Sequence, residues 1–295
     1  MTRPHVPVMA GEVLELVVFR TPCVLVDLTV GAGGHASEFL AASAPTGQVF
    51  ASDRDERALS IAEAHLAEHG ERVRFLHADS VRALEAYAAQ GVRPDAILLD
   101  LGVSSMQLDD EERGFSLRED APLDMRMDRT QKRTAADVIN KSSTGKLERI
   151  LREYGDESRS RKLAEAFVAR RRERPFRTTG DLRRVIEDVL GHKGGRIHSA
   201  TRTFQALRLE VNRERELLQQ ALPLALDVLA PGGRLVVIAF ESGDDRVVKQ
   251  GFKDAAEAGR GQVLTRRPLR PGRQEVGRNR RARSARLRAF EVTQD

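Results

Sequence analysis

The stretch "VLVDLTVGAGGHASEFL", residues 24–40, joins an apolar strand, a glycine-rich turn and the start of a helix. Residues 24–30 are almost continuously apolar, which is typical of a strand buried on both faces of a parallel sheet. Gly31, Gly33 and Gly34 let the backbone turn tightly and approach a ligand with no Cβ in the way. The helix that follows offers free N–H groups and a positive dipole end. The stretch therefore predicts an α/β fold with a ligand site beyond its first strand.

Further apolar stretches continue this pattern along the chain, with helical patterns such as "ERALSIAEAHLAEHG" between the first four strands. Strands that alternate with helices predict a parallel sheet with helices on both faces. A Pro-Gly-Gly turn before the fifth strand and a final hairpin make the sheet similar to the Rossmann-like, seven-stranded sheet of class I adenosylmethionine-dependent methyltransferases, whose last strand is antiparallel. The further strands are expected at 48–53, 73–79, 96–102, 234–240, 262–265 and 284–293.

The long segment between the fourth and fifth strands does not fit a short crossover, which takes about thirty residues for a whole unit. Its sequence carries helical spacing and almost no β-branched runs, as in "TAADVINKSSTGKLERILREYG" and "TGDLRRVIEDVLG". We therefore expect an inserted all-helical domain at 108–206, with the sheet domain formed by 1–107 and 207–295. A single helix at 204–230 is expected to lead into the fifth strand. Within the insertion, "PLDMRMD" (122–128) fits either a lid over the substrate or domain packing.

Positive charge is concentrated in two places, although the chain of 295 residues has a formal net charge of only +5. Residues 266–288, called the arginine-rich segment below, contain ten Arg and one acid, Glu275. A second basic run is "RRRERPFR", residues 170–177. Arginine clusters suit a polyanion because the guanidinium binds phosphate through paired hydrogen bonds. The alternative is an ordinary solvated surface in a chain that uses Arg throughout.

The sequence argues against disulfides, membrane insertion and metal catalysis. Cys23 is the only cysteine, and no apolar run reaches the length of a membrane span. The N-terminus lacks a signal-peptide pattern. No His, Cys and Asp grouping has metal-ligand spacing, so we expect no catalytic metal. These features predict a cytoplasmic protein that does not associate with membranes.

Acidic residues at successive strand ends favour one class of nucleotide ligand. Asp53 ends the second strand, where a carboxylate can bind both hydroxyls of a ribose. Asp27 beside the glycine turn would repel a pyrophosphate but attract the amino group of a methionine moiety. Asp79, in "HAD" after the third strand, can place a polar group beside an adenine. The set favours S-adenosylmethionine over NAD, although 31–36 also fits the dinucleotide pattern, and turn or capping roles remain open for the acids.

Several long motifs resemble the MraW (RsmH) family of bacterial methyltransferases. They are "DLTVGAGGH" (27–35), "LLDLGVSSMQLDDEERGFSLREDAPLDMRMD" (98–128), "HSATRTFQALRLEVNRE" (198–214) and "RARSARLRAFE" (281–291). The resemblance covers nearly the whole chain. It implies methylation of the exocyclic N4 of a cytidine in the decoding region of 16S rRNA. The implied cofactor is S-adenosyl-L-methionine, and the implied partner is 16S rRNA or the 30S subunit.

The same resemblance implies a set of cofactor contacts, namely Gly33, Gly34, His35, Asp53, Asp79, Ser80, Asp100 and Gln107. We expect the catalytic groups just past the fourth strand, where other amino-methyltransferases place their acceptors. Asp100 would bridge cofactor and amine, and the hydroxyls of Ser104 and Ser105 would orient the base. A cytosine amine needs such acceptors because its lone pair is delocalised into the ring.

One position departs from the family pattern. After the fifth strand the family usually reads Phe-His-Ser-Leu-Glu-Asp-Arg, whereas this chain reads "FESGDDR", with Glu241 in place of the His. Either the rate or target position differs, or Glu241 makes the same hydrogen bonds, which we favour. The change also motivates an alternative function, a small-subunit assembly factor that binds rRNA with little or no turnover. A small-molecule methyltransferase is disfavoured by the basic segments and the insertion. The sequence leaves open whether the chain forms a homodimer.

Overall fold

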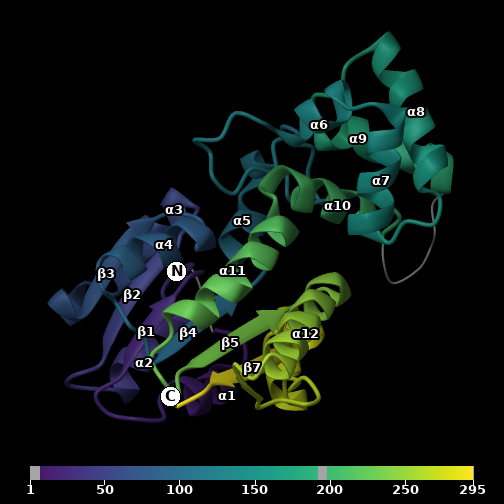
Figure 1. Cartoon of the computed structure of the whole chain (residues 1–295). Coiled ribbons are helices and arrows are strands. Elements are labelled where there is room, and N and C mark those ends of the chain that lie inside the picture. The colour runs from purple at the N-terminus through teal and green to yellow at the C-terminus, as the bar shows by residue number, and fades with distance from the viewer. Residues whose placement is uncertain (1–6, 192–197, 295) are drawn as a thin grey trace. The chain divides into compact units, whose positions relative to one another are not determined.

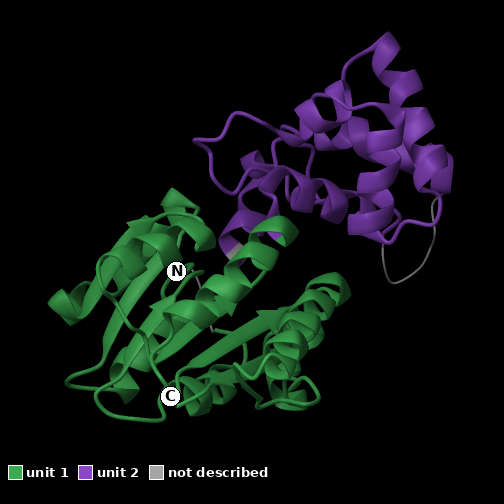
Figure 2. Ribbon diagram, in the orientation of Figure 1, with its two compact units in different colours: residues 1–102, 215–295 green, residues 103–214 purple. Residues whose placement is uncertain are grey.

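The computed structural model describes residues 7–191 and 198–294, except for the side chain of Ser105 (Figure 1). The chain divides into two compact units, shown in different colours in Figure 2. The first contains residues 1–102 and 215–295, and the second contains residues 103–214. The boundaries expected from the sequence, at 108 and 206, both lie inside the second unit.

The first unit is built on one seven-stranded sheet in the order β3-β2-β1-β4-β5-β7-β6. The pairs among β1 to β5 are parallel, and β7 is antiparallel to both β5 and β6. The predicted seven-stranded, Rossmann-like sheet with an antiparallel closing strand is therefore confirmed. The strands are β1 (Val24–Asp27), β2 (Gln48–Asp53), β3 (Val73–His77), β4 (Ala96–Asp100), β5 (Arg234–Ala239), β6 (Gly261–Val263) and β7 (Arg286–Val292).

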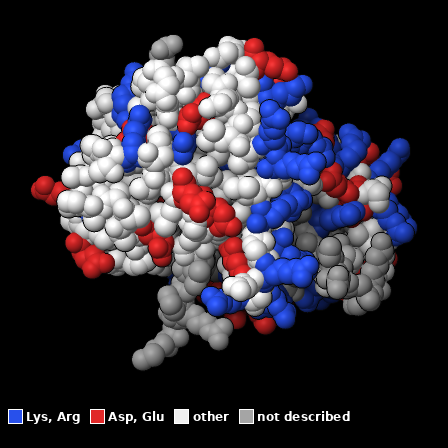
Figure 3. Space-filling model, turned by 90° about the horizontal axis from the view of Figure 1, so that it is seen from below, with Lys and Arg blue, Asp and Glu red and all other residues white. Residues whose placement is uncertain are grey.

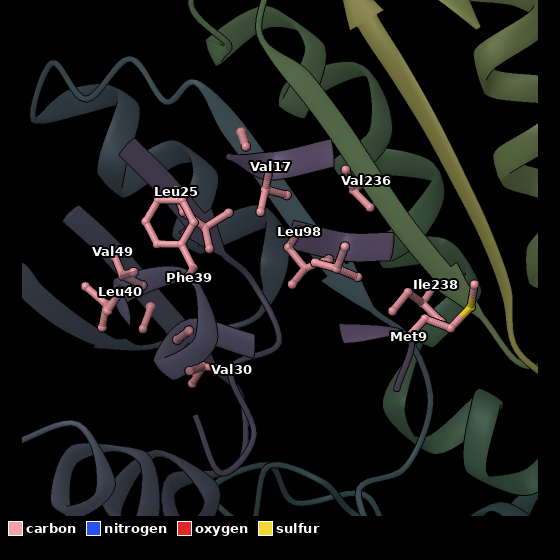
Figure 4. Close-up of a cluster of buried hydrophobic side chains, with 14 of the residues drawn as sticks. Met9, Val17, Leu25, Val30, Phe39, Leu40, Val49, Leu98, Val236 and Ile238 are labelled. Atoms are coloured by element: carbon pink, nitrogen blue, oxygen red, sulfur yellow. The ribbon is translucent and has the colours of Figure 1, made fainter. Parts of the chain in front are cut away.

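Helices cover both faces of this sheet, which explains why its strands are almost continuously apolar. Leu25 and Leu98 belong to one apolar cluster, whereas their chain neighbours Val26 and Ile97 belong to another. Figure 4 shows the first cluster, where Phe39 of α2 lies beside Leu25. The helices of the first cluster are α1 (Ala10–Val17), α2 (Gly34–Ala42) and α3 (Glu56–His65); those of the second are α4 (Ser80–Ala89), α11 (Glu214–Val228) and α12 (Ser242–Glu257).

The second unit has an apolar core of its own, which includes Leu147, Ile150, Phe167 and Leu207. In the described part of this unit the regular structure is helical, apart from an isolated bridge that Pro122 makes. Its helices are α5 (Ser105–Asp109), α6 (Ala135–Lys141), α7 (Thr144–Gly155), α8 (Ser160–Glu173), α9 (Thr179–Leu190) and α10 (Thr201–Asn212).

The single helix expected at 204–230 is wrong. The structure has two helices there, α10 and α11, because Arg213 between them adopts a left-handed conformation with φ 51°. Asn212 at the end of α10 is buried and donates to the carbonyl of Met125, while its side-chain oxygen accepts the N–H of Met127. Met125 and Met127 are buried in the core of the second unit, which favours domain packing over a lid for 122–128.

Candidate active site at the strand ends

Three carboxylates end the three neighbouring parallel strands β2, β1 and β4. Asp53, Asp27 and Asp100 are the last residues of these strands, and the ladder places Asp27 opposite Leu98 of β4. Because the carboxyl ends of parallel strands lie at one edge of a sheet, the three acids line the same edge. This is the edge at which α/β sheets bind their ligands.

The glycine turn that follows β1, residues 31–34, lies at this edge of the sheet. Gly31 and Gly33 have φ of 55° and 85°, in the left-handed region that favours glycine. The N–H of Gly31 donates to Asp53 Oδ2 at 2.9 Å, so the turn is tied to the end of β2. Gly34 begins α2, and a Cβ there would lie 3.3 Å from carbons of Pro7. The first residue of α2 thus leaves its backbone uncovered by a side chain of its own.

Asp53 is fixed in place by backbone donors. Its Oδ1 accepts the N–H of Asp55 at 2.9 Å, and its Oδ2 accepts that of Gly31. Burial raises the pKa of Asp53 to about 6, against the lowering effect of these two hydrogen bonds. Each oxygen keeps a further lone pair, so the carboxylate can still accept two hydroxyl donors. These two acceptor positions fit the two hydroxyls of a ribose.

Asp27 and Asp100 are both held in surroundings that disfavour their charge. Asp27 is 1% exposed, and burial raises its pKa to about 7 despite the lowering effect of His35. Burial also raises the pKa of Asp100 to about 7. The N–H of Asp100 donates to the hydroxyl of Thr29 at 2.6 Å. Among the described residues Asp100 Oδ1 is buried and has no hydrogen-bond partner, which leaves one acceptor for a bound molecule.

His35 lies between the glycine turn and Asp100. Its Nε2 is 2.9 Å from the carbonyl oxygen of Val8, and a carbonyl can only accept, so Nε2 carries the proton and donates. The other ring nitrogen, Nδ1, then faces Asp100 Oδ2 at 3.9 Å. That distance is too long for a hydrogen bond, so the two groups lie close together without being bonded. The acids at the ends of β1 and β4 and the His35 ring therefore lie close together at this edge of the sheet.

Asp79 and Ser80 follow β3 at the start of α4. Asp79 is the N-cap of this helix, and its Oδ1 accepts the N–H groups of Val81 and Arg82, both at 3.1 Å. Ser80 is the first helical residue. The structure thus gives Asp79 a capping role, one of the alternatives left open by the sequence, and it occupies the strand end next to Asp53.

Ser104, Ser105 and Gln107 belong to the second unit, whereas the acids at the strand ends belong to the first. Ser104 caps α5: its hydroxyl accepts the N–H of Gln107, and the side-chain oxygen of Gln107 accepts the N–H of Ser104 at 3.0 Å. Gln107 is 5% exposed. The structure therefore gives Ser104 and Gln107 a local structural role. The catalytic and cofactor-binding roles expected for these residues stay predictions.

Two contributors to this group were not predicted from the sequence. Thr29 joins the end of β1 to the end of β4 through its hydroxyl, and the only sequence signal is a polar residue inside an apolar strand. Val8 holds His35 through a backbone carbonyl, for which side-chain identity gives no signal. Glu241, the departure from the family pattern, is the N-cap of α12 without a side-chain capping bond.

The raised pKa values predict a pH-dependent affinity for a cationic ligand. Below about pH 7 Asp27 and Asp100 hold protons in the ligand-free protein. A ligand with an ammonium or sulfonium group favours the ionised carboxylates, so its binding releases protons and weakens as pH falls. We expect S-adenosylmethionine to bind at least about tenfold more weakly at pH 5.5 than at pH 8.

This expectation is checked by isothermal titration calorimetry near pH 6.5 in two buffers that differ in ionisation enthalpy. Net proton release on binding is the expected result. Proton uptake, or an affinity that is the same at both pH values, would contradict the charge assignment at Asp27 and Asp100.

The fold and the site together define the class of protein. The sheet has an antiparallel seventh strand, a glycine turn follows β1, and the strands β1, β2 and β4 each end in a carboxylate, which are the features of a class I adenosylmethionine-dependent methyltransferase. The residues present fit the cofactor: the Asp53 carboxylate suits a ribose, and the acidic strand ends at Asp27 and Asp100 suit a cationic methionine group. The chain belongs to the MraW methylase family, whose family model matches residues 2–293. S-Adenosylmethionine is accordingly its cofactor.

Three relatives extend over nearly the whole chain, and each is named ribosomal RNA small subunit methyltransferase H. The protein from Citrifermentans bemidjiense is 44% identical over 97% of this chain and 98% of its own. That from Syntrophotalea carbinolica is 46% identical over 97% of both chains. That from Solibacter usitatus is 43% identical over 98% of this chain and 99% of its own.

Two further findings concern residues 7–191 and 198–294. No helix in these ranges combines the length and the apolar character that crossing a membrane requires. No three His, Cys, Asp or Glu side chains within them are grouped so that they could hold a metal ion.

Proposed function

We propose that the chain methylates the exocyclic N4 of a cytidine in the decoding region of 16S rRNA. Membership of the MraW methylase family supports methyl transfer, and the names of the relatives support small-subunit rRNA as the substrate. The observation that carries the chemistry is Asp100, an acid at the end of β4 whose Oδ1 is buried and has no hydrogen-bond partner among the described residues. Work on ribosomal RNA would place the protein in the cytoplasm.

The reaction requires positioning more than covalent assistance. The bound cofactor supplies an electrophilic methyl group on a sulfonium. The cytosine amine is a weak nucleophile because its lone pair is delocalised, so an acceptor must draw it out of conjugation and fix its direction. Asp100 Oδ1 can accept an N–H of the amine. As the bond between the methyl carbon and the nitrogen forms, the bond from that carbon to the sulfonium sulfur would break, and S-adenosylhomocysteine would leave. The nitrogen becomes positive and loses a proton, which the Asp100 carboxylate can take because burial raises its pKa to about 7.

The remaining residues of the site receive binding roles in this proposal. The N-terminus of α2, with Gly33, Gly34 and His35, holds the methionine part of the cofactor. Asp53 binds the ribose hydroxyls. The roles carried over from the family are adenine binding by Asp79 and Ser80, cofactor contact by Gln107 and base orientation by Ser104 and Ser105. A base in a stacked strand must be extruded before it reaches such a site.

The arginine-rich segment offers a surface for the RNA backbone. Figure 3 shows Lys and Arg side chains gathered on one side of the visible face. Two of the ten arginines serve the fold: Arg288 forms an ion pair with Asp245 at 2.7 Å, and Arg286 lies near the same carboxylate. The other arginines of the segment are exposed, namely Arg266, Arg267, Arg270, Arg273, Arg278, Arg280, Arg281 and Arg283.

Replacing Arg280, Arg281 and Arg283 together by alanine is expected to weaken RNA binding and to reduce its salt dependence. Fewer phosphates are neutralised, so fewer counterions are released, and the slope of log K against log salt falls by about two to three. RNA binding measured at several salt concentrations checks this. A matched triple variant of Arg93, Lys249 and Lys253 should keep the wild-type slope. An unchanged slope in the first variant would identify these arginines as solvated surface only.

The proposed function is tested by transfer of labelled methyl groups from S-adenosylmethionine to three acceptors: 30S subunits, naked 16S rRNA and a small-molecule amine. Label in 16S rRNA, in either form, is the expected result, and the two forms distinguish an assembled from a free substrate. The alternative function, an assembly factor, predicts that the protein binds 30S particles without transferring label. Label on neither RNA acceptor would contradict methyl transfer to rRNA.

A further inference from the structure

Residues 7–9, called the strap below, pack against the glycine turn. The Cβ that a side chain would add to Gly34 would lie 3.3 Å from ring carbons of Pro7, so the Pro7 ring packs closely on the Gly34 backbone. The carbonyl of Val8 accepts the Nε2–H of His35 at 2.9 Å. Val8 and Met9 are 6% and 1% exposed and belong to the apolar cluster of α1 and α2. The strap therefore determines how Gly34 and His35 are presented at the strand ends.

The other side of the strap is held by the arginine-rich segment. The N–H of Met9 donates to Glu275 Oε1 at 2.7 Å, and Glu275 lies on the short helix α13 (Arg273–Arg278). Met9 is the N-cap of α1, with a left-handed φ of 55° and no side-chain capping bond. Because Met9 is buried, its N–H needs a protein acceptor, and a distant acid provides it. Ala282 and Ala285, from the same segment, pack in the same apolar cluster as Met9.

The contacts form a continuous series from Glu275 through the strap and His35 to Asp100. The series rests on the carboxylate–amide bond at Met9, the carbonyl–imidazole bond at Val8 and the 3.9 Å approach of His35 Nδ1 to Asp100 Oδ2. We propose that Glu275 is a positioning residue for the cofactor: it anchors the strap, and the strap fixes Gly34 and His35 for binding S-adenosylmethionine. The inference rests on the proposed cofactor site, and it assigns a role to the one acid of the arginine-rich segment.

Loss of this anchor should act on cofactor affinity rather than on the bond-forming step. A strap without its anchor leaves the His35 ring free to turn and the start of α2 free to move. Ordering them again then opposes cofactor binding. Asp100 itself keeps its bond to Thr29 and its place at the end of β4. We therefore expect a higher KM for S-adenosylmethionine and a kcat that changes little.

The test is calorimetric measurement of S-adenosylmethionine affinity, without RNA, for four proteins. Glu275→Ala is expected to bind about five- to twentyfold more weakly than the wild type, the scale of one charge-assisted hydrogen bond. Glu275→Gln keeps an acceptor oxygen and should recover most of this loss. Gln274→Ala is the matched control, because Gln274 is exposed on the same helix, and it should bind as the wild type does.

Binding of Glu275→Ala within twofold of the wild type would overturn the proposal, as would an equal loss in Glu275→Gln or Gln274→Ala. If Glu275→Ala does not fold, Glu275→Asp decides the matter, because it keeps the charge but shortens the reach by one methylene. A weakening of about threefold or more is then expected, and unchanged binding would overturn the proposal. Since no RNA is present, either result is independent of the proposed rRNA substrate.

Discussion

Replacing Asp100 by asparagine is expected to slow methyl transfer at least about a hundredfold while the protein keeps its fold. The carboxylate ends β4, and one of its oxygens is buried without a partner among the described residues. Asparagine has nearly the same size and keeps the backbone bond to Thr29, so the strand end should be preserved. It cannot take a proton, however, and it presents no negative charge to a developing ammonium.

The measurement is single-turnover methyl transfer to 30S particles with saturating S-adenosylmethionine and excess enzyme, which separates the chemical step from cofactor affinity. Asp254→Asn is a suitable control, because Asp254 is exposed on α12 and its carboxylate accepts a hydrogen bond from Gln250 of the same helix. It should transfer methyl at the wild-type rate. Near wild-type turnover by Asp100→Asn would leave Asp100 with a turn-forming role alone.

Replacing Asp53 by alanine is expected to weaken S-adenosylmethionine binding about ten- to a hundredfold. A charge-assisted hydrogen bond to a ribose hydroxyl contributes about 1.5–3 kcal/mol, and its loss converts to this range of affinity. Asp53 also holds the glycine turn through the N–H of Gly31, so the alanine variant removes two favourable effects together.

Asp53→Asn separates these two effects. Its side-chain oxygen can still accept the N–H of Gly31, but the amide group cannot accept a second hydroxyl. We expect this variant to lose affinity by less than the alanine variant and by more than Asp254→Asn. Calorimetry that shows unchanged affinity for Asp53→Ala would remove Asp53 from the cofactor site.

The sheet could be predicted because its signals are local. The stretches at 24–30 and 96–102 are apolar at consecutive positions, and the helices between strands follow in chain order. The acids at the strand ends could be predicted for the same reason, since a residue that closes an apolar run of a parallel sheet lies at its carboxyl edge. The antiparallel β7 followed from resemblance rather than from periodicity.

The break between α10 and α11 could not be predicted from the sequence. Helical periodicity continues through "EVNRERELL", and Arg213, unlike Gly or Asn, gives no sign of a left-handed backbone. The conformation is set by packing, because the buried Asn212 beside it bonds to the backbone of Met125 and Met127, more than eighty residues away in the chain. The boundary of the second unit, at 214 rather than 206, follows from this break.

The contacts that position Gly34 and His35 for the cofactor could not be predicted from the sequence either. Val8 and Met9 act through backbone groups, and Met9 and Glu275 are 266 positions apart. Ser104 and Gln107 differ from these contacts, because their sequence does carry a signal. They are three residues apart, which is the spacing of a capping box, and the structure places them in one. Their spacing thus agrees with a structural role that the functional interpretation of these residues did not include.

The most direct test of the proposed function is to locate the transferred methyl group. 30S subunits are incubated with the protein and labelled S-adenosylmethionine, the 16S rRNA is cut into defined fragments, and the nucleosides of each are identified by mass spectrometry. The proposal predicts N4-methylcytidine in the fragment that contains the decoding region, and its loss with Asp100→Asn. Label on another nucleoside, on a ring carbon of cytidine, or outside the 16S rRNA would contradict it.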